Sequence, residues 1–363
     1  MEAMSRFPFP VPLGWYQLGW SDELAPGDVW PLYYFGRDLV LWRDTEGVAH
    51  LQNAICPHLG GHLGHGGHVE GCELQCPFHG WKFDAAGDNS EIPYAERPNR
   101  SAHITTYPVI ERNGLLMAWY HPEGAEPTWE IPEIPEFNDP ENYSPMQRRT
   151  VEIPAAWQEI AENQVDSAHF RYVHNTEQVP EVTLYETDGP LARMRSIQKF
   201  PTPRGVVEGS IDVDTYGPGF GVIRFGGIVE TVLLGCNVPV TTDECELRFS
   251  FTVRKLDDEL ATSSVGDAFV EEVSRQVIED IPIWKWKGHV AKPALAANDG
   301  PYLKFRKWAS QFYAEGVDLD QDIYPPNRPD SARPQPEGTH KATASSRLKG
   351  EDVIRSDMMT GAP

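Results

Sequence analysis

The stretch CPHLGGHLGHGGHVEGCELQCPFHGW, residues 56–81, packs three cysteines, five histidines and seven glycines into 26 positions. Cys56 and His58 are separated by one residue, and Cys76 and His79 by two. Each half of the stretch therefore offers one thiolate and one imidazole to a metal. A structural zinc finger normally places its two cysteines in one half and its two histidines in the other, and that separation is absent here.

The mixed halves fit a Rieske 2Fe-2S cluster, in which two cysteines hold one iron and two histidines hold the other. We therefore predict that Cys56, His58, Cys76 and His79 bind such a cluster, with a structural zinc as the alternative. Glycines between the ligands let both loops approach a cluster closely. The remaining soft side chains of the stretch are interpreted as ordinary loop and buried residues: His62, His65, His68 and Cys72.

Composition limits the remaining possibilities. A chain of 363 residues is longer than one hydrophobic core usually spans, so two domains are expected. Five cysteines are too few for a disulfide framework. A net charge of −23 argues against nucleic acid or anionic membrane as a partner. With no apolar run approaching the roughly 20 residues of a membrane span and no secretion signal, we expect a cytoplasmic protein.

Changes in composition divide the chain into four zones. Residues 1–120 hold short aromatic and β-branched runs that predict an antiparallel all-β domain. Residues 121–145 are rich in proline and acids and predict an extended connector. Residues 146–316 alternate helical patterns, near 155–174, 265–287 and 301–315, with several strand-like runs, which indicates an α+β domain. The tail, 317–363, has the polar and proline-rich composition of a flexible segment.

A second metal site is predicted in the segment WQEIAENQVDSAHFRYVHNTEQ, residues 157–178. Asp166 lies three residues before His169 and can accept a hydrogen bond from its ring. Five residues separate His169 from His174, which on an unbroken helix would point the two rings roughly 140° apart. If both bind one ion, the helix must end or bulge between residues 170 and 173. Without the neighbouring cluster motif, ordinary half-buried histidines would be the better interpretation.

These motifs together resemble the Rieske non-haem iron oxygenases, and the resemblance covers nearly all of residues 10–316. It implies a C-terminal helix-grip (START-like) domain with an antiparallel sheet, and a mononuclear iron held by two histidines and one carboxylate. The pattern Asn163, Asp166, His169, His174 matches the iron motif of the family. The third ligand is expected at Asp280, directly before the run IPIW, with the adjacent Glu279 as the alternative.

The resemblance also implies an assembly. In this family the aspartate corresponding to Asp166 links an iron-bound histidine to a Rieske histidine, here His79, of a neighbouring subunit. A homotrimer follows, or a hexamer where an additional subunit is present. No credible dinucleotide-binding fingerprint is found, so electrons from NAD(P)H are expected through a separate reductase or ferredoxin. The basic segments 284–292 and 304–307 are candidate docking sites for that partner, but solvated helix faces are the preferred interpretation.

The tracts HGWKFDAAGDNSEIPYAE and KPALAANDGPYLKFRKWASQFY are most similar to the 3-ketosteroid 9α-hydroxylase and cholesterol 7-desaturase group. This implies a monooxygenase that uses O2 to hydroxylate a steroid-like or other large apolar ring, with apolar residues of segment 220–240 lining the pocket. A sterol desaturase, or an oxygenase or demethylase of a smaller aromatic or amine, is the alternative. A non-enzymatic electron carrier with a single cluster is the least favoured interpretation.

Overall fold

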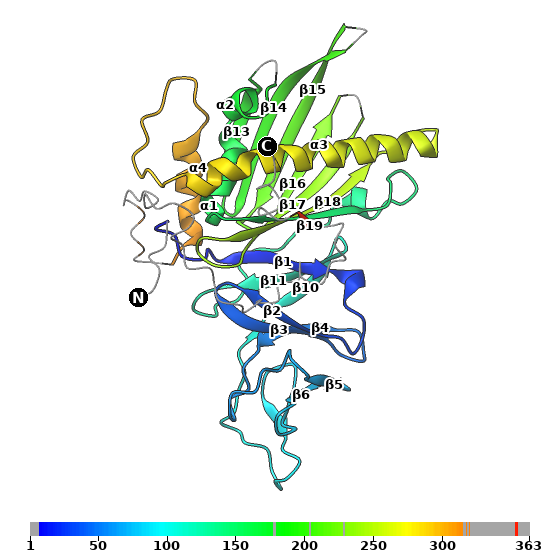
Figure 1. The fold of residues 1–363 in the computed structure, drawn as a ribbon, viewed down its shortest axis with the longest axis vertical. Helices are drawn as coiled ribbons and strands as arrows, with labels where there is room; N and C mark the ends of the chain where they lie inside the picture. Colours follow the sequence, from blue (N-terminus) through cyan, green and yellow to red (C-terminus); the bar gives the residue numbers. More distant parts are fainter. Residues whose placement is uncertain are drawn as a thin grey trace, which may run out of the picture.

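The computed structural model describes residues 7–176, 179–202, 205–227, 229–314, 317, 319 and 353–354. Two parts follow one another along the long axis of the molecule (Figure 1). The strands of the N-terminal part occupy one end, and a large sheet crossed by a long helix occupies the other. In the described part of the chain, no helix is both long and apolar enough to cross a membrane.

The N-terminal part consists of three small antiparallel sheets, with strand orders β1-β11-β10, β2-β3-β4-β9 and β5-β6-β7-β8. The first four strands fall on the aromatic and β-branched runs from which the sequence predicts them. The strands are β1 (Gly14–Trp20), β2 (Val29–Tyr34), β3 (Arg37–Arg43), β4 (Ala49–Asn53), β5 (His68–Glu70), β6 (Glu73–Gln75), β7 (Lys82–Phe83), β8 (Asn89–Glu91), β9 (Thr106–Tyr107), β10 (Val109–Arg112) and β11 (Leu115–Tyr120).

The C-terminal part is built on one eight-stranded sheet of order β13-β14-β15-β16-β17-β18-β12-β19. Its pairs are antiparallel except β12 with β19, which is parallel. The strands are β12 (Gln147–Ile153), β13 (Glu181–Asp188), β14 (Leu191–Thr202), β15 (Gly205–Tyr216), β16 (Gly221–Gly226), β17 (Thr231–Pro239), β18 (Cys245–Val253) and β19 (Val353–Ile354).

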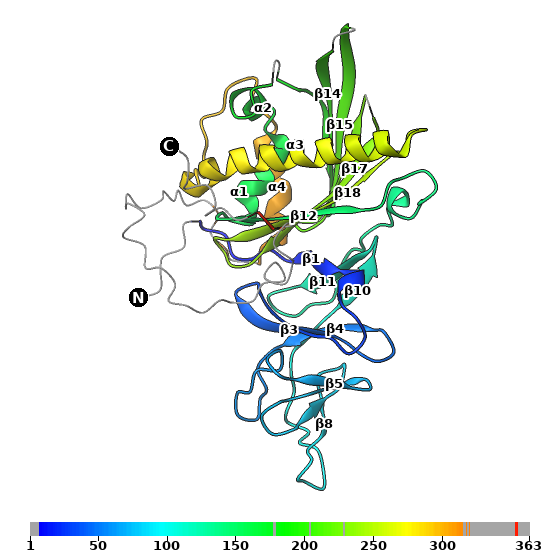
Figure 2. The same cartoon turned by 45° about the vertical axis from the view of Figure 1, so that its right-hand side comes forward.

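One long helix, α3 (Glu259–Trp286), lies across this sheet in both views (Figures 1 and 2). Asp258 caps its first turn by accepting a hydrogen bond from the amide of Leu260 at 3.0 Å. The other helices are shorter: α1 (Trp157–Ala161), α2 (Ala168–Tyr172) and α4 (Tyr302–Ala309), with 3-10 turns η1 (Ser21–Glu23), η2 (Pro135–Phe137), η3 (Glu162–Val165) and η4 (Ser310–Phe312). The α+β class and the antiparallel sheet are as predicted.

The helical stretch predicted near 155–174 is divided into three pieces, α1, η3 and α2. The proline-rich segment 121–145 contains the turn η2 but no strand or α-helix. Of the tail after residue 316, only residues 317, 319 and 353–354 are described, so the prediction of a flexible tail lies outside the described residues. The four-zone division of the chain itself remains a prediction.

A buried polar network joins the two parts. The hydroxyl of Tyr34 on β2 donates to Oε1 of Glu246 on β18 at 3.0 Å, and the Arg248 guanidinium donates to both of them, at 2.8 and 2.6 Å. Next to it, the indole of Trp20 donates to the Ser250 hydroxyl at 2.8 Å. Glu246 and Arg248 are fully buried. Such groups are tolerated inside a protein only when they are paired, so this network fixes how the two parts meet.

Candidate metal centres

The two cysteine–histidine loops at the N-terminal end share one backbone geometry. The amide of Cys56 donates to the carbonyl five residues later at 2.8 Å, and the amide of Cys76 does the same at the same distance. The amides of Gly60 and Gly80 return hydrogen bonds to the carbonyls of these cysteines, each at 3.0 Å. Both glycines have a positive φ, 76° and 74°. The sequence therefore folds twice into the same tight turn, with one cysteine and one histidine on each.

Aromatic rings surround the histidines of these loops. The rings of His58 and His79 lie edge to face with centroids 4.6 Å apart. Trp81 stacks on His58 at 4.3 Å and donates its indole N–H to the Tyr94 hydroxyl at 2.7 Å. Phe78 lies against His79, with ring centroids 3.9 Å apart. These contacts hold both imidazoles close together.

These residues fit a two-iron cluster. Cys56 and Cys76 are buried, and burial raises the pKa of the Cys56 thiol to about 11, so a bound cation is needed to keep it as a thiolate at neutral pH. Nδ1 of His79 is buried without a hydrogen-bond partner. A Cβ atom at Gly61 would lie 3.0 Å from Sγ of Cys76, so the close approach of the loops depends on glycine there. Among the described cysteines none forms a disulfide.

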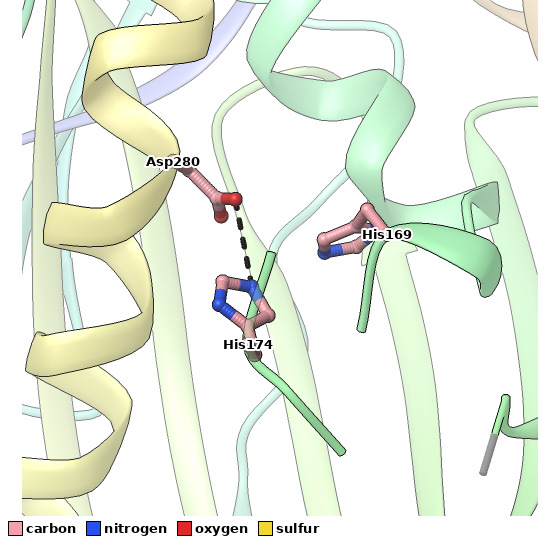
Figure 3. Close-up of side chains that lie close together, drawn as sticks. All are labelled: His169, His174 and Asp280. Atoms are coloured by element: carbon pink, nitrogen blue, oxygen red, sulfur yellow. Dashed lines mark ion pairs between the residues drawn. The ribbon is translucent and has the colours of Figure 1, made fainter. Parts of the chain in front are cut away.

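The second predicted centre is assembled from two elements distant in sequence. Side-chain atoms of His169, His174 and Asp280 lie within 4.8 Å of one another, and these residues face a common point (Figure 3). His169 comes from α2, His174 follows that helix, and Asp280 comes from α3. Because α2 ends at Tyr172, the chain turns between the two histidines, as the five-residue spacing required. The structure thus brings together the three residues named as iron ligands from the sequence.

Polar contacts hold the side chains of His174 and Asp280 in place. Nε2 of His174 lies 3.5 Å from Oδ1 of Asp280, while its Nδ1 lies 3.0 Å from Oε2 of Glu279. The Asn163 amide donates to Oδ2 of Asp280 at 3.2 Å. Burial would lower the pKa of His174, but the carboxylates of Asp280 and Glu279 outweigh it and raise that pKa. The site therefore favours a positive charge between these groups, which suits a divalent cation.

Asp166 lies beside this centre, in contact with His169. Its Oδ1 accepts hydrogen bonds from the amides of Ala168 and His169, at 3.0 and 3.2 Å, and its Oδ2 lies 3.7 Å from Nδ1 of His169. Burial would raise the pKa of Asp166, but contacts with His169 and a hydrogen bond from Tyr302 outweigh it and lower that pKa to about 2. The carboxylate is therefore ionised at neutral pH and adjoins a predicted iron ligand.

A buried ionic cluster positions the ligand-bearing segment. The carboxylate of Glu159 on α1 pairs with Nδ1 of His289 and with Nζ of Lys287, each at 2.7 Å. The carboxylate of Glu162 pairs with Nε of Arg306 at 2.7 Å. Both glutamates are almost fully buried. Two of the cations in the basic segments 284–292 and 304–307 are thus used inside the protein. This weakens the hypothesis that these segments dock a redox partner.

A cavity of about 270 Å³ opens over the three side chains, near the lower end of the ~300–1,000 Å³ usual for small-molecule pockets. Its wall is mainly apolar, with Ile211, Val213, Phe220, Ile223, Phe225, Leu233, Leu247, Phe249, Val277 and Trp284. Residues 220, 223, 225 and 233 lie in the segment 220–240 predicted to line the pocket. Two amides, Gln198 and Asn237, also line it; Nδ2 and Oδ1 of Asn237 and Nε2 of Gln198 are buried without hydrogen-bond partners.

Within one chain the two centres lie in different parts of the molecule. In both views the β5–β8 sheet, which adjoins the cysteine–histidine loops, ends one pole of the molecule, while α2 and α3 lie beyond the β1-β11-β10 sheet (Figures 1 and 2). The other soft side chains of the opening stretch have ordinary surroundings. Nδ1 of His62 accepts the amide of Gly64 at 3.1 Å, His68 contacts Glu70, and Cys72 is exposed.

Sequence reasoning missed two contacts. Glu279 was considered only as an alternative ligand, whereas it contacts the nitrogen of His174 that faces away from Asp280. Its position beside a predicted ligand on a helix is a weak signal for such a role. Tyr302, at the start of α4, hydrogen-bonds to Asp166. No feature of the sequence links these two residues, since only the packing of α4 brings them together.

Comparison with known proteins agrees with both halves of the structure. Residues 14–108 match the Rieske [2Fe-2S] domain, and residues 118–313 match the 3-ketosteroid 9alpha-hydroxylase C-terminal domain. The first match favours the cluster over a structural zinc.

Relatives with these domains resemble most of the chain. An oxygenase component of 3-ketosteroid-9-alpha-monooxygenase from Rhodococcus rhodochrous is 33% identical over 328 residues, covering 85% of this chain and 86% of that protein. Cholesterol 7-desaturase from Caenorhabditis elegans is 32% identical over 351 residues, covering 87% and 80%. Among solved structures, dicamba monooxygenase bound to 3,6-dichlorosalicylic acid has a TM-score of 0.67 at 19% identity, covering 84% of this chain and 97% of that one, a likeness of fold alone.

Proposed function

Because this chain belongs to the Rieske oxygenase family of the 3-ketosteroid 9α-hydroxylases, we propose that it hydroxylates a steroid-like substrate as the terminal oxygenase of a multicomponent system. The chain is an oxidoreductase with a Rieske cluster and a mononuclear iron. The observation that carries the proposal is the meeting of His169, His174 and Asp280 at the base of an apolar cavity.

Each predicted ligand has a role in this proposal. Cys56, His58, Cys76 and His79 hold the cluster, and His169, His174 and Asp280 hold the mononuclear iron. When bound, the cluster supplies single electrons, and the iron supplies open coordination positions for O2. Asn163 orients the Asp280 carboxylate through its 3.2 Å hydrogen bond. The apolar wall excludes water and presents a substrate carbon to these positions.

The lining of the cavity supports a mainly apolar substrate that carries at least one oxygen. Leaving a buried polar group without a partner costs roughly 1–3 kcal/mol. The free polar atoms of Asn237 and Gln198 are therefore best explained as contacts for polar groups of the substrate. A sterol or ketosteroid meets both requirements. The cholesterol 7-desaturase relative supports sterol desaturation as the second candidate.

The separation of the two centres supports a trimer in which subunits exchange electrons. Leu59 and Phe78, on the two cysteine–histidine loops, are exposed apolar side chains, 64% and 59% accessible. Tyr172, 79% accessible, lines a second hollow together with Asp166 and His169. Docking the cysteine–histidine loops of one subunit into this hollow would bury the apolar side chains of the loops together with Tyr172. Asp166 would then bridge the partner subunit's His79 to His169.

Electron supply requires a second protein in this proposal. The donor is an NAD(P)H-dependent reductase or ferredoxin, and O2 is the co-substrate. We propose that the system works in the cytoplasm, where NAD(P)H is available.

The test is a reconstituted assay with a surrogate NADH-dependent reductase, O2 and a panel of 3-ketosteroids, sterols and small aromatic acids. The expected result is a substrate-dependent product heavier by one oxygen atom, with the oxygen derived from O2. A product lighter by two hydrogens would select desaturation. Turnover of small aromatics alone would overturn the steroid assignment, and NADH oxidation without any modified product would overturn the oxygenase.

A further inference from the structure

Next to the face of α3 that lines the cavity, the helix carries a continuous row of charged and polar side chains. Glu272, Arg275, Gln276 and Glu279 are spaced three or four residues apart, so their side chains are neighbours on one face. Arg275 binds both oxygens of Glu272, at 2.6 and 2.9 Å, and the Gln276 amide donates to the same carboxylate at 2.8 Å. Each member of the row is therefore held by the next.

The row ends at His174, a predicted iron ligand, on the ring nitrogen that does not face Asp280. Nη1 of Arg275 pairs with Oε1 of Glu279, and Oε2 of Glu279 lies 3.0 Å from Nδ1 of His174. Both oxygens of Glu279 are thus committed, one to the arginine and one to the imidazole. His174 is 2% exposed as a side chain, whereas Arg275 is 44% exposed. The chain of contacts runs from the surface to the buried imidazole.

This geometry determines which nitrogen of His174 is free for a metal. Both nitrogens face carboxylates, which accept but cannot donate, yet only the 3.0 Å contact of Nδ1 with Glu279 is a hydrogen bond, whereas Nε2 lies 3.5 Å from Asp280; in the neutral ring the proton is therefore on Nδ1. The unprotonated Nε2 then faces Asp280. Glu279 cannot easily be a ligand itself, because it contacts the nitrogen on the opposite side of the ring from Asp280.

We infer that Glu279, held by Arg275 and Glu272, is a positioning residue that fixes the tautomer and orientation of His174 for binding Fe(II). The inference rests on the proposed function, since it requires His174 and Asp280 to be ligands. Carboxylates that receive the second N–H of a metal-bound histidine typically contribute 10–100-fold to metal affinity. Glu279→Gln keeps the shape but removes the charge, so its Fe(II) affinity should fall by roughly that factor.

The experiment measures the Kd for Fe(II) by chelator competition, on full-length enzyme from which mononuclear iron has been removed and the cluster retained. The variants are Glu279→Gln, Arg275→Met, Asp280→Asn and His174→Ala. Glu271→Gln is the matched control, because it removes the same charge from an exposed position of the same helix. The circular dichroism spectrum of each sample reports whether α3 and the C-terminal part are folded, and the Rieske signal in its electron paramagnetic resonance spectrum reports whether the cluster is retained.

The expected order is no measurable binding for His174→Ala and Asp280→Asn, about 10–100-fold weaker binding for Glu279→Gln, a smaller loss for Arg275→Met, and no change for Glu271→Gln. Wild-type affinity in Glu279→Gln would overturn the positioning role. Complete loss in Glu279→Gln with retention in Asp280→Asn would make Glu279 the ligand. Wild-type affinity in His174→Ala would instead overturn the proposed iron site. If Glu279→Gln loses its cluster, Arg275→Met provides the same comparison with Glu279 left in place.

Discussion

The two metal centres differ in how the chain builds them. All four proposed cluster ligands lie within residues 56–79, on two turns whose backbone hydrogen bonds match one another to 0.1 Å. The proposed mononuclear site takes His169 and His174 from one segment and Asp280, more than a hundred residues later, from helix α3. The first centre is a local property of the chain. The second exists only when α3 is packed correctly across the sheet.

This difference predicts that the centres can be removed independently. His174→Ala should abolish turnover, at least ~10³-fold, because it deletes a ligand to the reacting iron. The Rieske signal and the iron bound to the cluster should remain. The measurement is steady-state turnover with spectroscopy of the cluster on the same sample. His103→Ala, at an exposed position of the N-terminal part, is the matched control. Unchanged turnover in His174→Ala would show that His174 is not a ligand to the reacting iron.

A substitution in the buried network between the N-terminal and C-terminal parts tests whether the two parts unfold together. Glu246→Gln leaves the Arg248 charge buried without its counter-ion and should lower the free energy of unfolding by about 3–5 kcal/mol. Denaturant unfolding, followed by tryptophan fluorescence and by cluster absorbance, is the measurement. One coincident, shifted transition is expected. Glu244→Gln, an exposed position in the same strand connection, should change stability little. Loss of the cluster at unchanged stability of the C-terminal part would show that the parts are independent.

Electron transfer between the centres should depend on the charge of the Asp166 side chain more than on its shape. Asp166→Asn retains the side chain's size but removes the carboxylate beside His169, and should slow turnover about 10–100-fold. Both metal centres should remain loaded. Stopped-flow reoxidation of the reduced cluster in the presence of substrate and O2 would locate the defect in electron transfer. A normal rate of reoxidation would contradict the bridging role.

Substitution of Asn237 should give the smallest effects: the protein becomes more stable, while its catalysis becomes worse because KM rises. Asn237→Leu removes buried polar atoms that lack a partner, so the free energy of unfolding should rise by about 1 kcal/mol. The same change should raise KM for an oxygenated substrate about tenfold, the equivalent of one lost hydrogen bond of roughly 1.4 kcal/mol. Thermal unfolding and KM measurements on one preparation give both values. A lower stability with unchanged KM would assign Asn237 to the protein core instead of the substrate.

The contrast between the centres also explains what the sequence could predict. The cluster ligands were identifiable from the spacing of Cys56, His58, Cys76 and His79, because short turns keep sequence neighbours together. The strands β1 to β4 were identifiable from their aromatic and β-branched runs. For the second centre, the spacing of His169 and His174 alone did not predict a metal site. It did so only together with the cluster motif.

What escaped prediction depends on tertiary packing. The end of the helix between the two histidines was expected, but the helix expected over 155–174 is also interrupted before them, by the 3-10 turn η3 and the residues that separate it from α2. The contact between Glu279 and His174 depends on the rotation of α3, and the contact between Tyr302 and Asp166 depends on the docking of α4. The burial of Glu159 and Glu162 beneath a basic segment could not be read from charge patterning, which suggested an exposed face.

The central claim is that one chain carries both a locally built and an assembled iron centre. The most direct test is the content of iron and acid-labile sulfide in anaerobically purified protein, together with the spectrum after dithionite reduction. The account predicts three irons and two sulfides per chain, from one 2Fe-2S cluster and one mononuclear ion, with a Rieske signal. Two irons and two sulfides, in protein that takes up no further Fe(II), would contradict it and leave an electron carrier.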